Sequence, residues 1–245
     1  MELFDVFAGA LLAMLATSLG ALLILLIRKI EGPLYSAMLA FAGGVMFFSA
    51  AEMLRGAFLT TEAAIIATGL VLGLAFILVL ERSIPHLHIL IRKKKITPAK
   101  TKAALISGTI TLHNMPEGLA IASAFATSGP LGWLVASAIA LQDIPEGFAI
   151  SAPLACYGVK LRKAIGFGIL SGIVEFAAAI AGFFFLSAFA FLVPFGLSFS
   201  AGAMLFVVFV ELMPDAMANK MGKIAVASFL IGILATFCIA GVLGF

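Results

Sequence analysis

Residues 103–127 read AALISGTITLHNMPEGLAIASAFAT, an apolar run that carries the polar hexad HNMPEG at residues 113–118. About 20 mostly apolar residues are enough for a helix to cross the hydrocarbon core of a bilayer. His113 and Glu117 are four residues apart, so they would lie on one face of such a helix. The run therefore predicts a transmembrane helix with a polar site near the middle of the membrane.

The composition of the whole chain also indicates a membrane protein. Of its 245 residues, 63% are hydrophobic and only 11% are charged, and the mean hydropathy is +1.22. A soluble domain typically carries roughly 25% charged residues, so a soluble enzyme is excluded. The two cysteines, Cys156 and Cys238, are too few for a disulfide framework and form no CxxC metal motif.

Seven further apolar runs accompany the first. The eight predicted spans cover approximately residues 5–27, 34–55, 63–84, 103–127, 130–156, 164–188, 193–214 and 223–244. Backbone groups in lipid must be hydrogen-bonded within the segment, which predicts an all-α fold. Met1–Asp5 carries two acidic residues and no basic residue, so we interpret the N-terminal run at 5–27 as a span and not as a cleaved signal. We expect residues 1–245 to form a single transmembrane domain.

Basic residues are concentrated in alternate loops. The loops after the first, third, fifth and seventh spans hold 14 of the 15 Lys and Arg residues, and the other side holds only Arg55. The positive-inside rule then predicts these loops in the cytoplasm and both termini outside. We interpret the Arg92–Lys95 run as a topology signal that attracts anionic lipid, and not as a nucleic-acid site.

A second hexad, QDIPEG at residues 142–147, repeats the Pro, Glu and Gly of the first hexad 29 residues later. This spacing predicts two antiparallel neighbouring helices. An internal Pro removes one backbone hydrogen bond and frees a carbonyl oxygen. The span at 164–188 adds Glu175, with Ser171 one turn earlier; alone, such a serine most often bonds a neighbouring helix.

The predicted spans bring four carboxylates to the middle of the membrane: Glu117, Asp143, Glu146 and Glu175. Each costs at least ~2.5–3.5 kcal/mol at the bilayer centre, so together they cost on the order of 10 kcal/mol. The sequence places no Lys or Arg at their depth. Two divalent cations would neutralise them, and His113, Asn114 and Gln142 would complete the ligand shells. Such donors suit Zn²⁺, Fe²⁺ or Mn²⁺.

An internal repeat favours a transporter. Residues 42–54 and 201–213 share small residues followed by a glutamate, at a constant offset of 159. The two spans are predicted to run in opposite directions, and inverted repeats are typical of secondary transporters. We expect Glu52 near the outer face and Glu211 near the cytoplasmic face, as entrance and exit ligands, with Asp215 beyond. Interfacial solvation accounts equally well for Glu52 and Asp215.

With Glu175 and the eight-span layout, the hexads resemble the ZIP (Zrt/Irt-like) family of divalent metal transporters, and most of all its bacterial GufA-type branch. The resemblance implies a 3+2+3 inverted-repeat bundle with a binuclear metal centre. The implied first site uses His113, Glu117, Gln142 and Glu146, with Met46 as a neighbour. The implied second site uses Asn114, Glu117, Asp143, Glu146 and Glu175.

The resemblance also implies a mechanism and a setting. It implies alternating access that imports metal through a prokaryotic plasma (inner) membrane, and relatives often form homodimers. Zn²⁺ is the expected main cargo, with Cd²⁺, Fe²⁺, Mn²⁺ and Co²⁺ as further candidates and no prosthetic group. Many relatives carry His where this chain has Gln142, which weakens the expectation of zinc selectivity. His86 and His88 would form either a weak cytoplasmic metal site or ordinary helix-end histidines.

The residues also bear on three alternatives to a metal carrier. An intramembrane metalloenzyme is disfavoured because HExxH is absent and no Ser or Cys nucleophile pairs with His113. A proton-coupled carrier of an organic cation is disfavoured because His113 accompanies Glu117 and aromatic residues are nearly absent from the predicted midplane. A channel-like mechanism stays open. The chain is therefore expected to be a transporter and not an enzyme.

Overall fold

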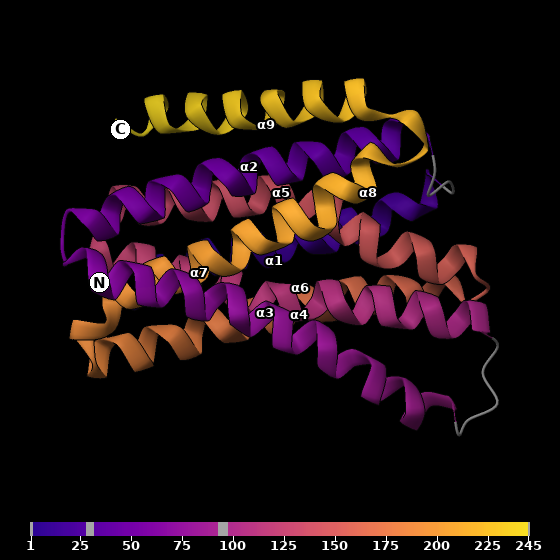
Figure 1. Cartoon of the computed structure of the whole chain (residues 1–245), viewed down its shortest axis with the longest axis horizontal. Helices are drawn as coiled ribbons and strands as arrows, with labels where there is room; N and C mark the ends of the chain where they lie inside the picture. Colours follow the sequence, from indigo (N-terminus) through magenta and orange to yellow (C-terminus); the bar gives the residue numbers. More distant parts are fainter. Residues whose placement is uncertain (1, 28–31, 93–97, 245) are drawn as a thin grey trace.

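The structure, a computed structural model, describes residues 2–27, 32–92 and 98–244, without the side chains of 81, 83–111 and 219. These ranges are built from helices and contain no strand (Figure 1). The helices are α1 (Leu3–Leu22), α2 (Pro33–Phe58), α3 (Ala63–Arg92), α4 (Pro98–Thr127), α5 (Gly129–Cys156), α6 (Leu161–Ala188), α7 (Val193–Phe206), α8 (Met213–Met217) and α9 (Gly222–Val242). The predicted all-α fold is confirmed.

Among the residues that the structure describes, six segments are long and apolar enough to cross a membrane. They are Leu3–Leu25, Pro33–Phe58, Ala63–Leu80, Leu161–Ala188, Ala190–Met217 and Gly222–Val242. The helices α4 and α5 also have spanning length, at 30 and 28 residues, but each carries one of the polar hexads. The chain is thus an integral membrane protein, and the crossing of all eight predicted spans stays a prediction.

The seventh predicted span is not one regular helix. α7 is followed by a π-helical segment, Val207–Leu212, and then by the short helix α8. Pro214 lies at the start of α8 and has no N–H to donate to the carbonyl of Val210, one turn earlier. We attribute the wider π turn to this missing hydrogen bond. Such π segments occur often at functional sites.

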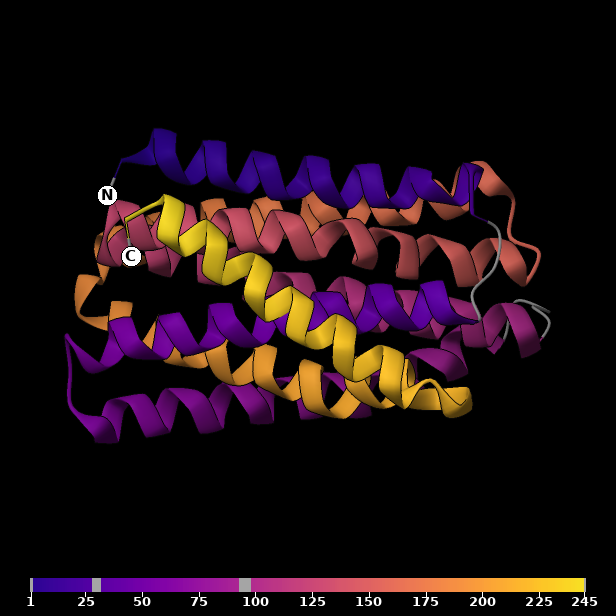
Figure 2. The same cartoon turned by 90° about the horizontal axis from the view of Figure 1, so that it is seen from above.

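The long helices pack into two groups. α1, α4, α5 and α6 contact one another and are called the site bundle below, while α2, α3, α7 and α9 form the second bundle. α2 packs against α5, and α4 packs against α7, which joins the two bundles. Figures 1 and 2 show the start of α1 and the end of α9 at the same end of the molecule. Because α4 contacts α7 and α5 contacts α2, α4 and α5 lie at the junction of the two bundles.

A very short turn makes α4 and α5 neighbours. Ser128 alone separates the two helices, and its side chain accepts a hydrogen bond from the backbone N–H of Leu131 at 3.3 Å. This N-cap satisfies one of the free donors at the start of α5. Pro130 lies in the first turn, where its missing N–H costs nothing. The turn folds the two hexads back toward each other.

The glycine that ends each hexad permits close helix contacts. Gly147 on α5 faces the carbonyl oxygen of Thr17 on α1, and Gly118 on α4 faces the carbonyl oxygen of Glu175 on α6. A Cβ atom at either glycine would collide with that backbone oxygen. Small residues allow membrane helices to approach each other in this way. The two glycines thus set the spacing of α1 and α6 around the hexads.

Replacing Gly147 by Ala should therefore destabilise the fold. We expect Gly147→Ala to lower the free energy of unfolding by about 1–3 kcal/mol, because the added methyl group meets rigid backbone. Gly166→Ala on α6 is the matched control, since a Cβ there meets open space, and it should leave stability unchanged or slightly raised. Thermal unfolding followed by circular dichroism in detergent compares the two. Equal stability of both variants would contradict the close contact.

Candidate metal site

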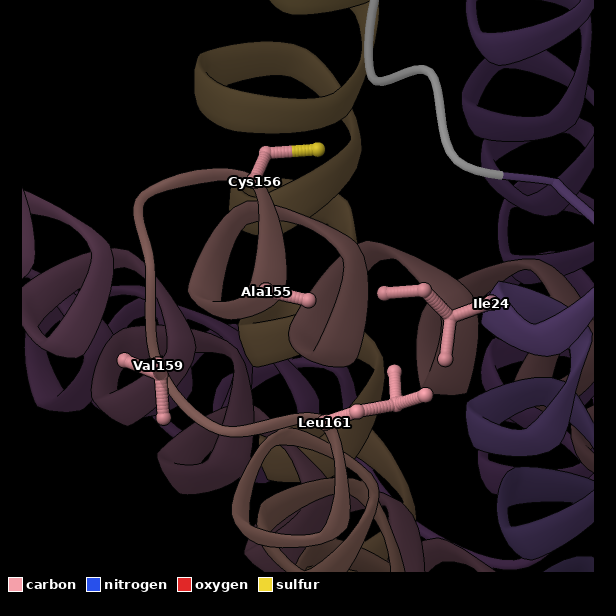
Figure 3. A pocket seen from close by; sticks show the side chains of 5 residues that line it. All are labelled: Ile24, Ala155, Cys156, Val159 and Leu161. Carbon is pink, nitrogen blue, oxygen red and sulfur yellow. The ribbon is translucent and has the colours of Figure 1, made fainter.

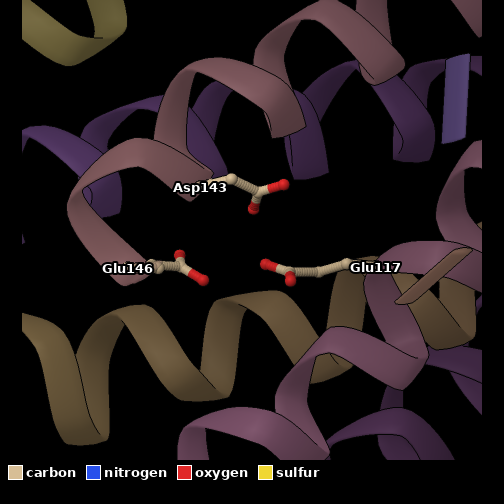
Figure 4. A group of neighbouring side chains, drawn as sticks. All are labelled: Glu117, Asp143 and Glu146. Carbon is tan, nitrogen blue, oxygen red and sulfur yellow. The ribbon is translucent and has the colours of Figure 1, made fainter. Parts of the chain in front are cut away.

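Three carboxylates converge between α4 and α5. Glu117 extends from α4, and Asp143 and Glu146 extend from α5 into the same space (Figure 4). One oxygen from each carboxylate lies within 4.8 Å of the others. Their side chains are only 1%, 0% and 3% exposed. Like charges so close together and away from water repel strongly, so the cluster requires a cation or protons.

The flanking helices complete the surroundings of this cluster. Glu175 on α6 is fully buried and close enough to Asp143 for their charges to interact. Asn114 on α4 is also fully buried and accepts a hydrogen bond at its Oδ1 from the Ser171 hydroxyl of α6, at 3.1 Å. The structure therefore brings the side chains of Glu117, Asp143, Glu146 and Glu175 close together.

Two of the carboxylates, those of Glu117 and Asp143, each have one oxygen in contact with a neutral hydrogen-bond donor. Gln142 Nε2 donates to Glu117 Oε1 at 2.5 Å, and Thr17 Oγ1 on α1 lies 3.1 Å from Asp143 Oδ2. In each case the second carboxylate oxygen, Glu117 Oε2 or Asp143 Oδ1, is buried and makes no hydrogen bond. These contacts fix the orientation of both carboxylates and leave one oxygen of each free to bind.

Several buried oxygen atoms of the cluster lack a hydrogen-bond donor. Among the described side chains they are Glu117 Oε2, Gln142 Oε1, Asp143 Oδ1, Glu146 Oε1 and both carboxylate oxygens of Glu175. An unsatisfied buried acceptor costs about 1–3 kcal/mol, and more when it is charged. Divalent metal ions are bound by such oxygen ligands. This donor set can hold a metal ion.

Glu211 connects the site to the second bundle. Its Oε1 lies 3.0 Å from His113 Nε2, which joins α4 to the π-helical segment. His113 is 4% exposed, whereas the Glu211 side chain is 20% exposed. Glu211 is also close enough to Glu146 for their charges to interact. The residue expected near the cytoplasmic face therefore lies directly beside a predicted ligand of the first site.

Other residues singled out from the sequence lie elsewhere or outside the described part. Met46 is 1% exposed and packs in the main hydrophobic core on α2, so its role beside the metal stays a prediction. Glu52 accepts a hydrogen bond from Arg55 Nε at 2.7 Å. Asp215 is exposed on α8. The side chains of His86 and His88 lie outside those that the structure describes.

Thr17 is the site residue that sequence reasoning missed. It is fully buried and contacts Asp143 from α1. The sequence pattern that could have identified Thr17 is weak, because a Thr-Ser pair within the apolar run 5–27 is most simply explained by hydrogen bonds within the helix. Such a bond does exist, since Thr17 Oγ1 lies 3.0 Å from the carbonyl oxygen of Ala13.

A cavity lies apart from the carboxylates. Its volume is about 360 Å³, and it is lined by Ile24, Ala155, Cys156, Val159 and Leu161 where α5 ends and α6 begins (Figure 3). Ile24, Ala155 and Leu161 point into a common space. Among the described residues of this lining, Cys156 alone has a side chain that binds metal ions, and a single such ligand is too few for a zinc site.

Comparisons with known proteins give the family of this chain. The family model described as ZIP Zinc transporter matches residues 88–241. The chain is 38% identical over 220 residues to the zinc transporter GufA of Myxococcus xanthus, which covers 85% of this chain and 87% of that protein. It is 35% identical to the zinc transporter ZupT of Stenotrophomonas maltophilia (92% and 90% covered) and 34% identical to the zinc transporter ZIPB of Bordetella bronchiseptica (83% and 70%).

A divalent metal ion should stabilise the purified protein through this cluster. A ligand at 100 times its dissociation constant adds about 2.7 kcal/mol of stability, so Zn²⁺ should raise the melting temperature by several degrees. Glu117→Gln should lose most of this rise, because the central carboxylate is neutralised. The exposed Glu62→Gln is the control and should keep it. An equal rise in Glu117→Gln, measured by differential scanning fluorimetry, would exclude the cluster as the metal site.

Proposed function

The chain belongs to the ZIP zinc transporter family, and on this premise we propose that it carries divalent transition-metal ions across a membrane into the cytoplasm, with Zn²⁺ as the main cargo. Cd²⁺, Fe²⁺, Mn²⁺ and Co²⁺ are further candidates. One observation carries the proposal: Glu117, Asp143 and Glu146 converge in the buried part of a helical membrane protein, and each has a buried oxygen that makes no hydrogen bond. The bacterial relatives support a place in a prokaryotic plasma membrane.

We further propose that the site holds two metal ions. The four carboxylates carry four negative charges when ionised, which two divalent ions would balance. The first site would use His113, Glu117, Gln142 and Glu146, and the second Asn114, Glu117, Asp143, Glu146 and Glu175. Glu117 and Glu146 would bridge, which their convergence with Asp143 favours. In the first site, metal would compete with Glu211 for His113.

The packing of the helices supports an inverted repeat. The contact of α1 with α5 corresponds to the contact of α6 with α4. In the same way, the contact of α2 with α9 corresponds to the contact of α7 with α3. This pattern pairs α1 with α6, α2 with α7, α3 with α9 and α4 with α5. The offset of 159 between residues 42–54 and 201–213 gives the same pairing of α2 with α7. Such a repeat, with its site at the centre, suits alternating access.

Movement between the two bundles could provide alternating access. The proposed carboxylate ligands belong to α4, α5 and α6 of the site bundle, whereas Glu211 belongs to a segment that follows α7 of the second bundle. Movement of one bundle against the other would carry the metal and separate His113 from Glu211. The crowded ligand set disfavours metalloenzyme chemistry, which needs an open coordination position. We also propose a homodimer, which the resemblance to the family implies.

Uptake into proteoliposomes tests the proposed function. The unaltered protein should transport Zn²⁺ and at least one of Cd²⁺, Fe²⁺, Mn²⁺ and Co²⁺. Glu117→Ala and Glu146→Ala should abolish uptake, because each removes a bridging carboxylate, while Glu175→Ala should mainly weaken binding of the second ion. Glu62→Ala is the control for the loss of an exposed carboxylate. Full uptake by Glu117→Ala would refute the site, and no uptake by the unaltered protein would refute the function.

Thiol labelling of intact cells tests the orientation. Cys156 and Cys238 are first replaced by Ser, and single cysteines are then introduced at two exposed positions, Glu62→Cys and Lys160→Cys. Glu62 lies between α2 and α3, and Lys160 lies in a basic loop between α5 and α6. A membrane-impermeant maleimide should label Glu62→Cys in intact cells and Lys160→Cys only after lysis. The reverse labelling pattern would show that the protein has the opposite orientation in the membrane.

A further inference from the structure

The Thr17 hydroxyl lies between two hydrogen-bond acceptors on α1 and α5, and the carboxylate of Glu175 on α6 is also close to it. Its Oγ1 is 3.1 Å from Asp143 Oδ2 and 3.0 Å from the carbonyl oxygen of Ala13. A hydroxyl has one proton, so it can donate fully to only one of them at a time. When a bound cation keeps Asp143 ionised, the bond to the carboxylate is charge-assisted and therefore the stronger of the two. Metal binding should then hold the proton on the Asp143 side.

This bond determines which oxygen of Asp143 faces the ion. With Oδ2 occupied by Thr17, the other oxygen, Oδ1, is buried and makes no hydrogen bond. Rotation of the carboxylate would exchange the two oxygens, and the Thr17 hydroxyl opposes this rotation. Groups that orient a metal ligand in this way raise metal affinity although they do not touch the metal.

The place of Thr17 in the fold corresponds to that of Glu175. The carbonyl oxygen of Thr17 meets Gly147 on α5, and the carbonyl oxygen of Glu175 meets Gly118 on α4. Gly147 and Gly118 end the two hexads, so Thr17 and Glu175 occupy equivalent positions on α1 and α6. Both side chains are fully buried, and they lie close to each other. The two flanking helices thus present a hydroxyl on one side and a carboxylate on the other.

The difference between hydroxyl and carboxylate has a charge consequence. With Thr17 neutral, the cluster of Glu117, Asp143, Glu146 and Glu175 carries at most four negative charges. A carboxylate at position 17 would add a fifth charge in a buried site, which two divalent ions would leave uncompensated. A hydroxyl donates a hydrogen bond and adds no charge. Threonine therefore suits a position whose task is to orient Asp143.

From this geometry we propose that Thr17 is a positioning residue for the second metal ion: its hydroxyl donates to Asp143 Oδ2 and holds Oδ1 toward the ion. The proposal rests on the proposed function, because it takes the divalent ion as the cargo of this site. It extends the site to α1, a helix in which the sequence predicted no site residue.

Zn²⁺ binding to the purified protein, measured by calorimetry, tests the role of Thr17. Thr17→Val removes the hydroxyl and keeps the branched shape, and it should weaken binding of the second ion about 10- to 100-fold. Thr17→Ser restores the hydroxyl and should bring affinity back close to that of the unaltered protein. Thr17→Ala is measured beside them, so that a folding defect of the valine variant does not decide the result.

Thr236→Val is the matched control. Thr236 is fully buried on α9, and its hydroxyl donates to the carbonyl oxygen of Gly232 four residues earlier, at 3.0 Å. This substitution removes the same helical hydrogen bond that Thr17 can form with Ala13. It should leave Zn²⁺ affinity unchanged. The difference between Thr17→Val and Thr236→Val thus separates the contacts of Thr17 with the buried carboxylates from its bond within the helix.

Two results would overturn the proposal. One is Zn²⁺ affinity in Thr17→Val and Thr17→Ala equal to that of Thr236→Val, and the other is failure of Thr17→Ser to restore affinity. Proteoliposome uptake by the same variants separates this proposal from the proposed function. No uptake by the unaltered protein refutes transport, whereas normal uptake with unchanged binding in Thr17→Val refutes only the role of Thr17.

Discussion

The burial of like-charged carboxylates between α4 and α5 is the constraint on which the rest of the structure depends. Glu117, Asp143 and Glu146 are almost completely removed from solvent and have oxygens within 4.8 Å of one another. In a membrane interior this arrangement is stable only with a cation or with protons. The surrounding helices therefore have to supply close packing, orienting donors and a path for the ion. Gly118 and Gly147 supply the packing, because they admit α6 and α1 to backbone contact beside the carboxylates.

The sequence predicted the helices well because lipid leaves little choice of structure. Each apolar run of spanning length became helical, and Ser128 joined α4 to α5 where the break was expected. The ends of helices were harder to predict, since hydropathy reports the part that suits lipid and not the whole helix. α3 accordingly continues to Arg92, beyond the predicted end at residue 84. The π segment at Val207–Leu212 depends on the local effect of Pro214, which hydropathy does not describe.

The candidate site was predictable to the extent that charge was its signal. Glu117, Asp143, Glu146 and Glu175 are conspicuous in apolar runs, and the structure brings them together. A hydroxyl gives no such signal, because threonine in an apolar helix usually bonds its own backbone. Thr17 became a site residue only when the contact of α1 with Gly147 placed it beside Asp143. Glu211 was expected near the cytoplasmic face, and only the path of the π segment reveals its contact with His113.

The two glutamates related by the internal repeat have different partners. Glu52 pairs with the half-exposed Arg55 on its own helix, whereas Glu211 pairs with the buried His113 on α4. A repeat with identical surroundings in both halves would give the two glutamates equivalent contacts. The difference has a chemical basis, because the residue that corresponds to His113 in the second hexad is Gln142, which donates to Glu117 instead. In the proposed transport cycle, Glu211 therefore contacts His113 of the site, whereas Glu52 contacts Arg55 on its own helix. The proposed alternating-access mechanism predicts such an asymmetry for a single conformation of the protein.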